Sequence, residues 1–150
     1  MIHNDYKYDN VVLDPANLSE IKAVLDWEMA TVGDPLMDFG TTLAYWVAAE
    51  ENDILKPFNL SWLPGNLNRE EMVEAYLSKS KLDLKATDML FYYVFGCFKV
   101  GVIAQQIYAR FKKGHTKDKR FAAMIYLVKA GAANGAKALE LGRISNLWEA

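Results

Sequence analysis

The sequence predicts an α+β fold, mostly α, in which a small N-terminal β-hairpin precedes a helical bundle. Two short apolar runs, at 11–14 and 22–28, are separated by the loop sequence PANLSEI, which is the pattern of an antiparallel strand pair. Most of the remaining chain has apolar residues at helical spacing, bounded by residues that favour helix ends. At 150 residues we expect a single domain covering 1–150.

The first predicted helix begins in the segment GDPLMDFG. Asp34 is a favoured helix N-cap, and Pro35 suits the first helical position because no backbone N–H is needed there. Apolar residues then recur at helical spacing to about Glu51. The stretch 52–67 contains prolines and a glycine, and it therefore predicts a loop, anchored by aromatic side chains.

Three further helices are predicted in the rest of the chain, at 69–80, 86–113 and 117–141. Asn68 followed by Glu71 forms a capping-box pattern before the first of them. Gly142 lies at the position just past a helix end, where glycine is favoured. The body of the domain is therefore expected to be a helical bundle.

The composition argues against several classes of protein. The net charge of −2 provides no global field for binding nucleic acid or an anionic membrane. The single cysteine, Cys97, rules out an internal disulfide and fits a reducing, cytoplasmic location. A polar, charged N-terminus gives no expectation of a signal peptide. The longest apolar stretch, 89–109, contains Lys99 and two glutamines, so we expect a buried helix there rather than a membrane span.

Three polar motifs follow one another in the first forty residues. HNDYKYDN at 3–10 has the pattern H-x-D-x-x-x-x-N, a predicted strand ends at Asp26, and Asp38 lies in the first turn of a predicted helix. Phosphoryl transfer uses these group types. One carboxylate can orient an acceptor hydroxyl and take its proton, while other oxygen ligands hold Mg²⁺ at the nucleotide phosphates.

The stretch HNDYKYDN resembles the catalytic loop of the protein-kinase-like phosphotransferases. LDWE, in place of D-F-G, and the following GDPLMDFG are most similar to the aminoglycoside phosphotransferase and choline kinase branch. AVLDWEMATVGDPLMDFGTTLAYW and FYYVFGCFKVGVIAQQIYARFKKG resemble the kinase-like domains related to those fused to acyl-CoA dehydrogenases. The ordered set of motifs is a stronger signal than any one of them alone.

The resemblance implies a role for each matching residue. Asp5 corresponds to the catalytic base, and Asn10 and Asp26 correspond to the ligands of Mg²⁺, which accompanies the co-substrate ATP. Lys7 matches a position where many such kinases place a cation near the transferred phosphate, and a solvated surface lysine is the competing interpretation. Glu28 is a candidate second-metal acid or, alternatively, a plain charge at a strand end.

Two further residues are expected to support the catalytic loop. His3 is interpreted as structural, holding the loop through a backbone contact. Asp38 matches a helix carboxylate that accepts backbone N–H bonds from the loop, so we expect it to be buried. Many relatives have Gly where this chain has Asn4, and Asn tolerates unusual backbone angles better than most residues, so we expect the loop to keep its shape.

The resemblance also implies an incomplete kinase-like fold. No G-x-G-x-x-G or V-A-I-K pattern occurs in the 150 residues, so we expect the C-terminal, catalytic lobe without the nucleotide lobe. The leading hypothesis is the catalytic lobe of an ATP-dependent small-molecule kinase that acts on a hydroxyl of a hydroxyacyl thioester, an aminoglycoside or a choline-like alcohol. The alternative is a non-catalytic helical remnant that dimerises or binds a partner.

The expected partner is a small-molecule hydroxyl substrate, and neither nucleic acid nor a membrane is expected. A basic cluster where the last two helices meet forms either a solvated helix corner or a site for an anionic ligand, such as a phosphorylated or coenzyme A-bearing substrate. Its members are Arg110, Lys112, Lys113, His115, Lys117, Lys119 and Arg120. A lone hairpin is marginal in water and leaves an unpaired edge, so we expect a homodimer whose interface includes the hairpin region.

Overall fold

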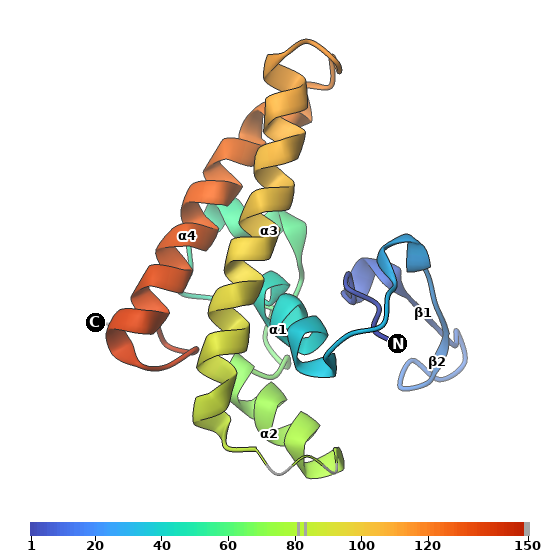
Figure 1. Cartoon of the computed structure of the whole chain (residues 1–150). Helices are drawn as coiled ribbons and strands as arrows, with labels where there is room; N and C mark the ends of the chain where they lie inside the picture. Colours follow the sequence, from blue (N-terminus) through green and yellow to red (C-terminus); the bar gives the residue numbers. More distant parts are fainter. Residues whose placement is uncertain (81, 83, 149–150) are drawn as a thin grey trace.

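The computed structural model describes residues 1–80, 82 and 84–148. Within this part of the chain the regular elements are β1 Val11–Leu13, β2 Ile21–Val24, α1 Pro35–Tyr45, α2 Arg69–Lys79, α3 Met89–Lys112 and α4 Met124–Leu141. α3 and α4 lie side by side as a long helical hairpin, α1 crosses α3, and α2 lies near the N-terminal end of α3 (Figure 1). The predicted α+β fold, mostly α with a small N-terminal hairpin, is confirmed at this level.

The two strands pair antiparallel, with Val11 opposite Val24. The second strand is shorter than the predicted 22–28, because the chain turns at Asp26, which has a left-handed backbone with φ of 64°. A 3₁₀ turn, Trp27–Met29, follows directly. The acidic segment after the strand is therefore an ordered turn rather than more strand.

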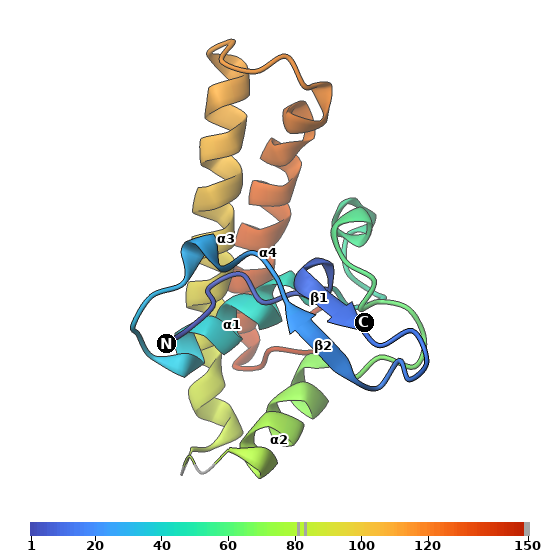
Figure 2. The same cartoon turned by 90° about the vertical axis from the view of Figure 1, so that its right-hand side faces the viewer.

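The hairpin lies to one side of the helices in Figure 1 and in front of them in Figure 2. Val12, Leu13 and Ile21 are exposed, and Val11 and Val24 are only half-buried. Most side chains of the hairpin are therefore open to solvent. The helical body positions the loop at residues 3–10 rather than the strands.

α1 begins as predicted and ends earlier than predicted. The Asp34 side chain accepts a hydrogen bond from the Leu36 N–H at 2.9 Å, which caps the helix, and Pro35 occupies the first position. The helix ends at Tyr45 instead of near Glu51. A long-range contact with the start of α2 lies at this end of the helix.

Arg69, at the start of α2, provides that contact. Its guanidinium is buried and donates to the main-chain carbonyls of Leu43, Trp46 and Ile144. The same group pairs with the buried carboxylate of Glu51, with Nη1 2.5 Å from Oε1. The arginine thus binds two carbonyls at the end of α1 and one in the C-terminal segment, and it connects α1, α2 and that segment.

Two glycines allow α1 and α3 to cross at close range. A Cβ added to Gly40 would lie 2.3 Å from the Tyr92 carbonyl oxygen, and one added to Gly96 would lie 2.2 Å from the Gly40 carbonyl oxygen. Both contacts are with backbone, which cannot move aside. The core around this crossing joins all four α-helices and the C-terminal segment: Leu36, Phe39, Leu43, Val73, Met89, Tyr93, Cys97, Ala138, Ile144 and Leu147.

α3 is only partly buried, which corrects the expectation of a buried helix at 89–109. One face carries the core residues Met89, Tyr93 and Cys97, whereas Phe91 and Phe98 on the other are 60% and 67% exposed. In the described part of the chain, α3 alone is long and apolar enough to meet the criteria for a membrane-spanning helix. Core helices of soluble proteins also meet them, and α3 packs against both α1 and α4.

The other helix ends follow the sequence signals closely. The capping box between Asn68 and Glu71 is present in both directions at the start of α2. Gly142 has a left-handed backbone with φ of 66° directly after α4. α4 begins later than the predicted residue 117, because Asp118 caps a 3₁₀ turn, Lys119–Ala123, that precedes the helix.

Candidate active site

The polar loop at residues 3–10 places three of the predicted site residues in direct contact. Asp5 and Asn10 are both buried, and the Asn10 amide donates to the Asp5 carbonyl oxygen at 2.8 Å and to its Oδ2 at 3.0 Å. Lys7 donates from Nζ to both carboxylate oxygens of Asp5, at 3.1 and 2.8 Å. A buried carboxylate is therefore held by an amide on one side and an ammonium on the other.

His3 connects this loop to the segment after β2. Its Nε2 lies 2.7 Å from the Leu25 carbonyl oxygen, and its Nδ1 accepts the Asp5 backbone N–H at 3.2 Å. A carbonyl can only accept, so Nε2 carries the proton and the ring is the neutral tautomer. The indole of Trp27 packs against the imidazole, with ring centroids 4.7 Å apart. His3 thus makes the backbone contact that the sequence interpretation expected of it.

Asp38, in the first turn of α1, accepts hydrogen bonds from the loop backbone. Its Oδ2 lies 2.6 Å from the His3 nitrogen and its Oδ1 lies 2.7 Å from the Asn4 nitrogen. These are the contacts expected from the sequence, although Asp38 is half-buried rather than buried. Thr42, one turn further along α1, donates from Oγ1 to the Tyr6 carbonyl oxygen at 2.8 Å. α1 therefore supports the loop at three backbone groups, the N–H groups of His3 and Asn4 and the carbonyl of Tyr6.

Lys99 is a contact residue that the sequence reasoning did not assign. It extends from α3 and donates from Nζ to the Asn4 carbonyl oxygen at 3.2 Å and to Asn4 Oδ1 at 2.9 Å. Burial lowers the pKa of Lys99, whereas the nearby charges of Asp38 and Asp5 raise it. The sequence does single out this position, because Lys99 is the only charged residue between Met89 and Ala109.

Asp26 and Glu28 are exposed, and within the described residues neither forms a hydrogen bond or ion pair with Asp5 or Asn10. The backbones are nevertheless adjacent, because the N–H of Leu25, the residue before Asp26, donates to the Asn10 carbonyl oxygen at 2.8 Å. The side chains of Asp5, Lys7 and Asn10 thus contact one another directly, whereas the segment before Asp26 contacts the loop through a backbone hydrogen bond. Convergence of the side chains of Asn10 and Asp26 stays a prediction.

The donor set around Asn10 fits a hard cation. Both of the hydrogen bonds made by the Asn10 amide use its nitrogen, and no described residue hydrogen-bonds to its Oδ1. Mg²⁺ prefers oxygen ligands and commonly uses few from the protein, with phosphate and water completing its shell. The described residues contain no group of three or more His, Cys, Asp and Glu side chains arranged to hold a metal. The Asn10 amide oxygen and the exposed carboxylates of Asp26 and Glu28 are the candidate ligands.

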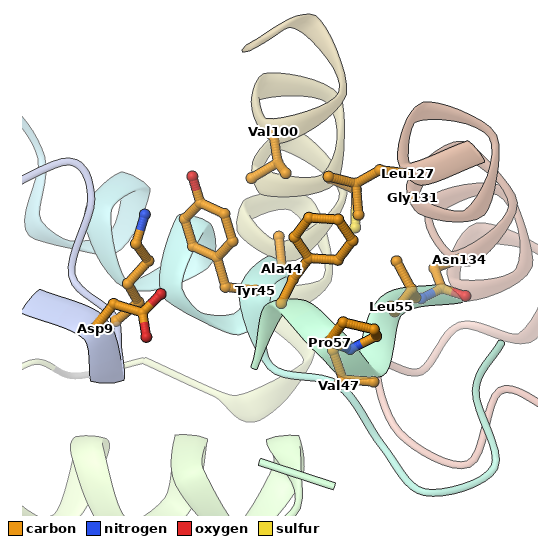
Figure 3. Close-up of a pocket in the computed structure, with 13 residues that line it drawn as sticks. Asp9, Ala44, Tyr45, Val47, Leu55, Pro57, Val100, Leu127, Gly131 and Asn134 are labelled. Carbon is orange, nitrogen blue, oxygen red and sulfur yellow. The ribbon is translucent and has the colours of Figure 1, made fainter. Parts of the chain in front are cut away.

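A pocket of about 200 Å³ lies beside the loop, between α1, α3, α4 and the turn Asp53–Phe58 (Figure 3). Lys7 and Tyr45 stand at its loop side, with Lys7 Nζ 5.0 Å from the centre of the Tyr45 ring. Burial, followed by the negative charge of Asp5, raises the pKa of Tyr45. The remaining wall is largely apolar: Ala44, Val47, Leu55, Pro57, Phe58, Cys97, Val100 and Leu127 contribute to it.

A comparison with protein families matches the part of the chain that contains the loop, the turn after β2 and α1. Residues 1–74 match the profile of the phosphotransferase enzyme family. The match confirms the resemblance predicted from the motifs.

The relatives are acyl-CoA dehydrogenase family members. Member 11 of Gallus gallus is 27% identical over 146 residues, which are 95% of this chain and 18% of that protein. Member 11 of Rattus norvegicus is 30% identical over 120 residues, covering 79% of this chain and 15% of that protein. Member 10 of Mus musculus is 32% identical over 121 residues, which cover 79% of this chain and 11% of that protein. The chain thus spans less than a fifth of the length of these relatives. No solved structure matches the chain significantly.

Proposed function

We propose that the chain forms the catalytic lobe of a kinase-like phosphotransferase that transfers a phosphoryl group from ATP to a substrate hydroxyl. The observation that carries the proposal is the buried Asp5 carboxylate, which is held by Asn10 and by Lys7, a residue that itself lines a largely apolar pocket. The family match of residues 1–74 supports the same class of reaction. A purely structural loop would have little reason to bury a carboxylate beside an open pocket.

The proposed reaction moves one proton and one phosphoryl group. The acceptor hydroxyl oxygen forms a bond to the γ-phosphorus of ATP, the bond from that phosphorus to the β–γ bridging oxygen breaks, and ADP leaves. Asp5 accepts the hydroxyl proton. Lys7 lies against the Asp5 carboxylate, where its positive charge offsets the negative charge that accumulates when the phosphoryl group approaches.

Asn10 and Asp26 are the residues proposed to hold Mg²⁺, through the Asn10 amide oxygen and the Asp26 carboxylate. The ion would neutralise phosphate charge and orient the nucleotide. Asn10 also holds Asp5 through its amide nitrogen, so one side chain would connect the metal site to the base. Glu28, exposed in the turn after Asp26, is the proposed acid for a second ion.

The acceptor that fits the pocket best is a molecule with an apolar body and a single reactive hydroxyl. Asp9 is the only carboxylate among the residues that line the pocket. Several carboxylates would be needed to favour a polycationic aminoglycoside. Aliphatic and aromatic side chains dominate the wall. Because the relatives are acyl-CoA dehydrogenase family members, we propose a hydroxyacyl thioester rather than an aminoglycoside or a choline-like alcohol.

The test is phosphoryl transfer from ATP with Mg²⁺, measured as phosphorylated product by ³¹P NMR with each of the three acceptor classes. We expect product with a hydroxyacyl thioester and loss of it in Asp5→Asn, which keeps the shape of the side chain but cannot act as a base. Glu74→Gln is the matched control, since Glu74 is exposed on α2, away from the loop. Equal product from wild type and Asp5→Asn would remove Asp5 as the base.

A further inference from the structure

We propose that Lys99 is a positioning residue that fixes the catalytic loop, and with it Asp5, relative to the wall of the acceptor pocket. The proposal rests on the proposed function of Asp5 as the base. It rests equally on contacts between α3 and the loop that are independent of any reaction. Lys99 does not touch Asp5, so its action is through the loop backbone.

The ammonium of Lys99 has a partner for each of its three N–H groups. These are the Asn4 carbonyl oxygen at 3.2 Å, Asn4 Oδ1 at 2.9 Å and Thr41 Oγ1 at 3.3 Å. The Thr41 hydroxyl donates its own proton to the Met37 carbonyl oxygen, which leaves its lone pairs free to accept from Lys99. All three partners are neutral oxygens. Lys99 is half-buried, so its ammonium loses part of its hydration, and no direct ion pair offsets that cost.

Those contacts converge on the one strained residue of the loop. Asn4 has a left-handed backbone with φ of 69°, which costs free energy for any residue other than glycine. Asp38 accepts its N–H, the Met29 carbonyl accepts its side-chain amide, and Lys99 binds both of its oxygens. A strained backbone persists only where its surroundings determine it, and here every polar group of the residue is engaged.

The position of Lys99 on α3 connects the loop to the pocket. Cys97 and Val100, two residues before it and one after it, line the pocket. The same turn of helix therefore forms part of the acceptor wall and holds Asn4, the residue immediately before Asp5. The distance from the acceptor wall to the base is thereby set by one rigid element rather than by a free loop.

The test compares Lys99→Met and Lys99→Arg with Lys112→Met, a matched control on the exposed end of the same helix. Methionine keeps most of the aliphatic stem and removes all three donors. We expect amide hydrogen exchange within residues 3–10 to rise about tenfold in Lys99→Met. Lys99→Arg should lie between that variant and wild type, because a planar guanidinium can reach some of the oxygens but not all three. Lys112→Met should match wild type.

The kinetic readout separates positioning from binding. We expect kcat for phosphoryl transfer to fall about 10²-fold in Lys99→Met with the KM for the acceptor nearly unchanged, because the pocket wall is kept and the base is displaced. Exchange and kcat like those of Lys112→Met would overturn the proposal. If wild type transfers no phosphoryl group, the proposed function fails, while hydrogen exchange still decides whether Lys99 fixes the loop. If Lys99→Met does not fold, unchanged exchange in Lys99→Arg overturns the proposal and raised exchange supports it.

Discussion

Removing the Asp38 carboxylate should destabilise the fold through the loop at residues 3–10. Its two oxygens accept the backbone N–H groups of His3 and Asn4 at 2.6 and 2.7 Å. A hydrogen bond to a charged group contributes about 1.5–3 kcal/mol, and the lower end applies because Asp38 is half-buried. Asp38→Ala should therefore lower the free energy of unfolding by about 3 kcal/mol. In a chain of this size, that corresponds to a fall in melting temperature of about 6–12 °C.

Thermal unfolding followed by circular dichroism would measure this effect. Asp38→Asn should fall between wild type and Asp38→Ala, since the amide keeps one acceptor oxygen and loses the charge. Glu74→Ala, which removes an exposed carboxylate from α2, is the control and should change the melting temperature little. An Asp38→Ala chain that melts like the control would show that the two hydrogen bonds do not hold the loop, and the supporting role of Asp38 would be wrong.

Three further outcomes are expected. Arg69→Met should cost about 3–5 kcal/mol, because the buried Glu51 carboxylate loses its cation, and an unchanged denaturation midpoint would contradict this. Burial raises the pKa of Cys97 to about 11, so the thiol stays protonated at pH 8 and should react slowly with iodoacetamide until denaturant is added. Fast labelling of the folded chain would refute that. We also propose that the exposed β1–β2 hairpin forms the interface of a homodimer, which light scattering at micromolar concentration would detect and Ile21→Lys should weaken. A wild-type monomer would count against the interface.

The helix starts could be predicted from the sequence because they depend on neighbouring residues. Asp34 caps α1, Asn68 and Glu71 form the capping box of α2, and Gly142 ends α4, each within one turn of its helix. The end of α1 could not be predicted in the same way. The guanidinium of Arg69 reaches back across 23 to 26 residues to the carbonyls of Leu43, in the last turn of α1, and Trp46, directly after it.

The contacts of the candidate site also differ in whether the sequence could predict them. The contacts of Asp38 with the loop were expected, because an ordered set of motifs implies a common arrangement even across 34 or 35 residues. Lys99 reaches Asn4 across 95 residues, and no motif contains both. Periodicity placed Lys99 on an apolar helix, yet it could not say which neighbour would receive its charge. A lone cation in an apolar helix is the kind of position at which such contacts should be sought.

We propose that the 3–10 loop and the Asp26 segment form one metal–nucleotide site. Paramagnetic Mn²⁺ in place of Mg²⁺, added with a non-hydrolysable ATP analogue, would test it by selective broadening of backbone amide NMR signals near the ion. We predict that the signals of Asn10 and Asp26 broaden first, while that of Lys112 at the far end of α3 stays sharp. Broadening that spares Asn10 and Asp26 and is concentrated elsewhere would contradict the account.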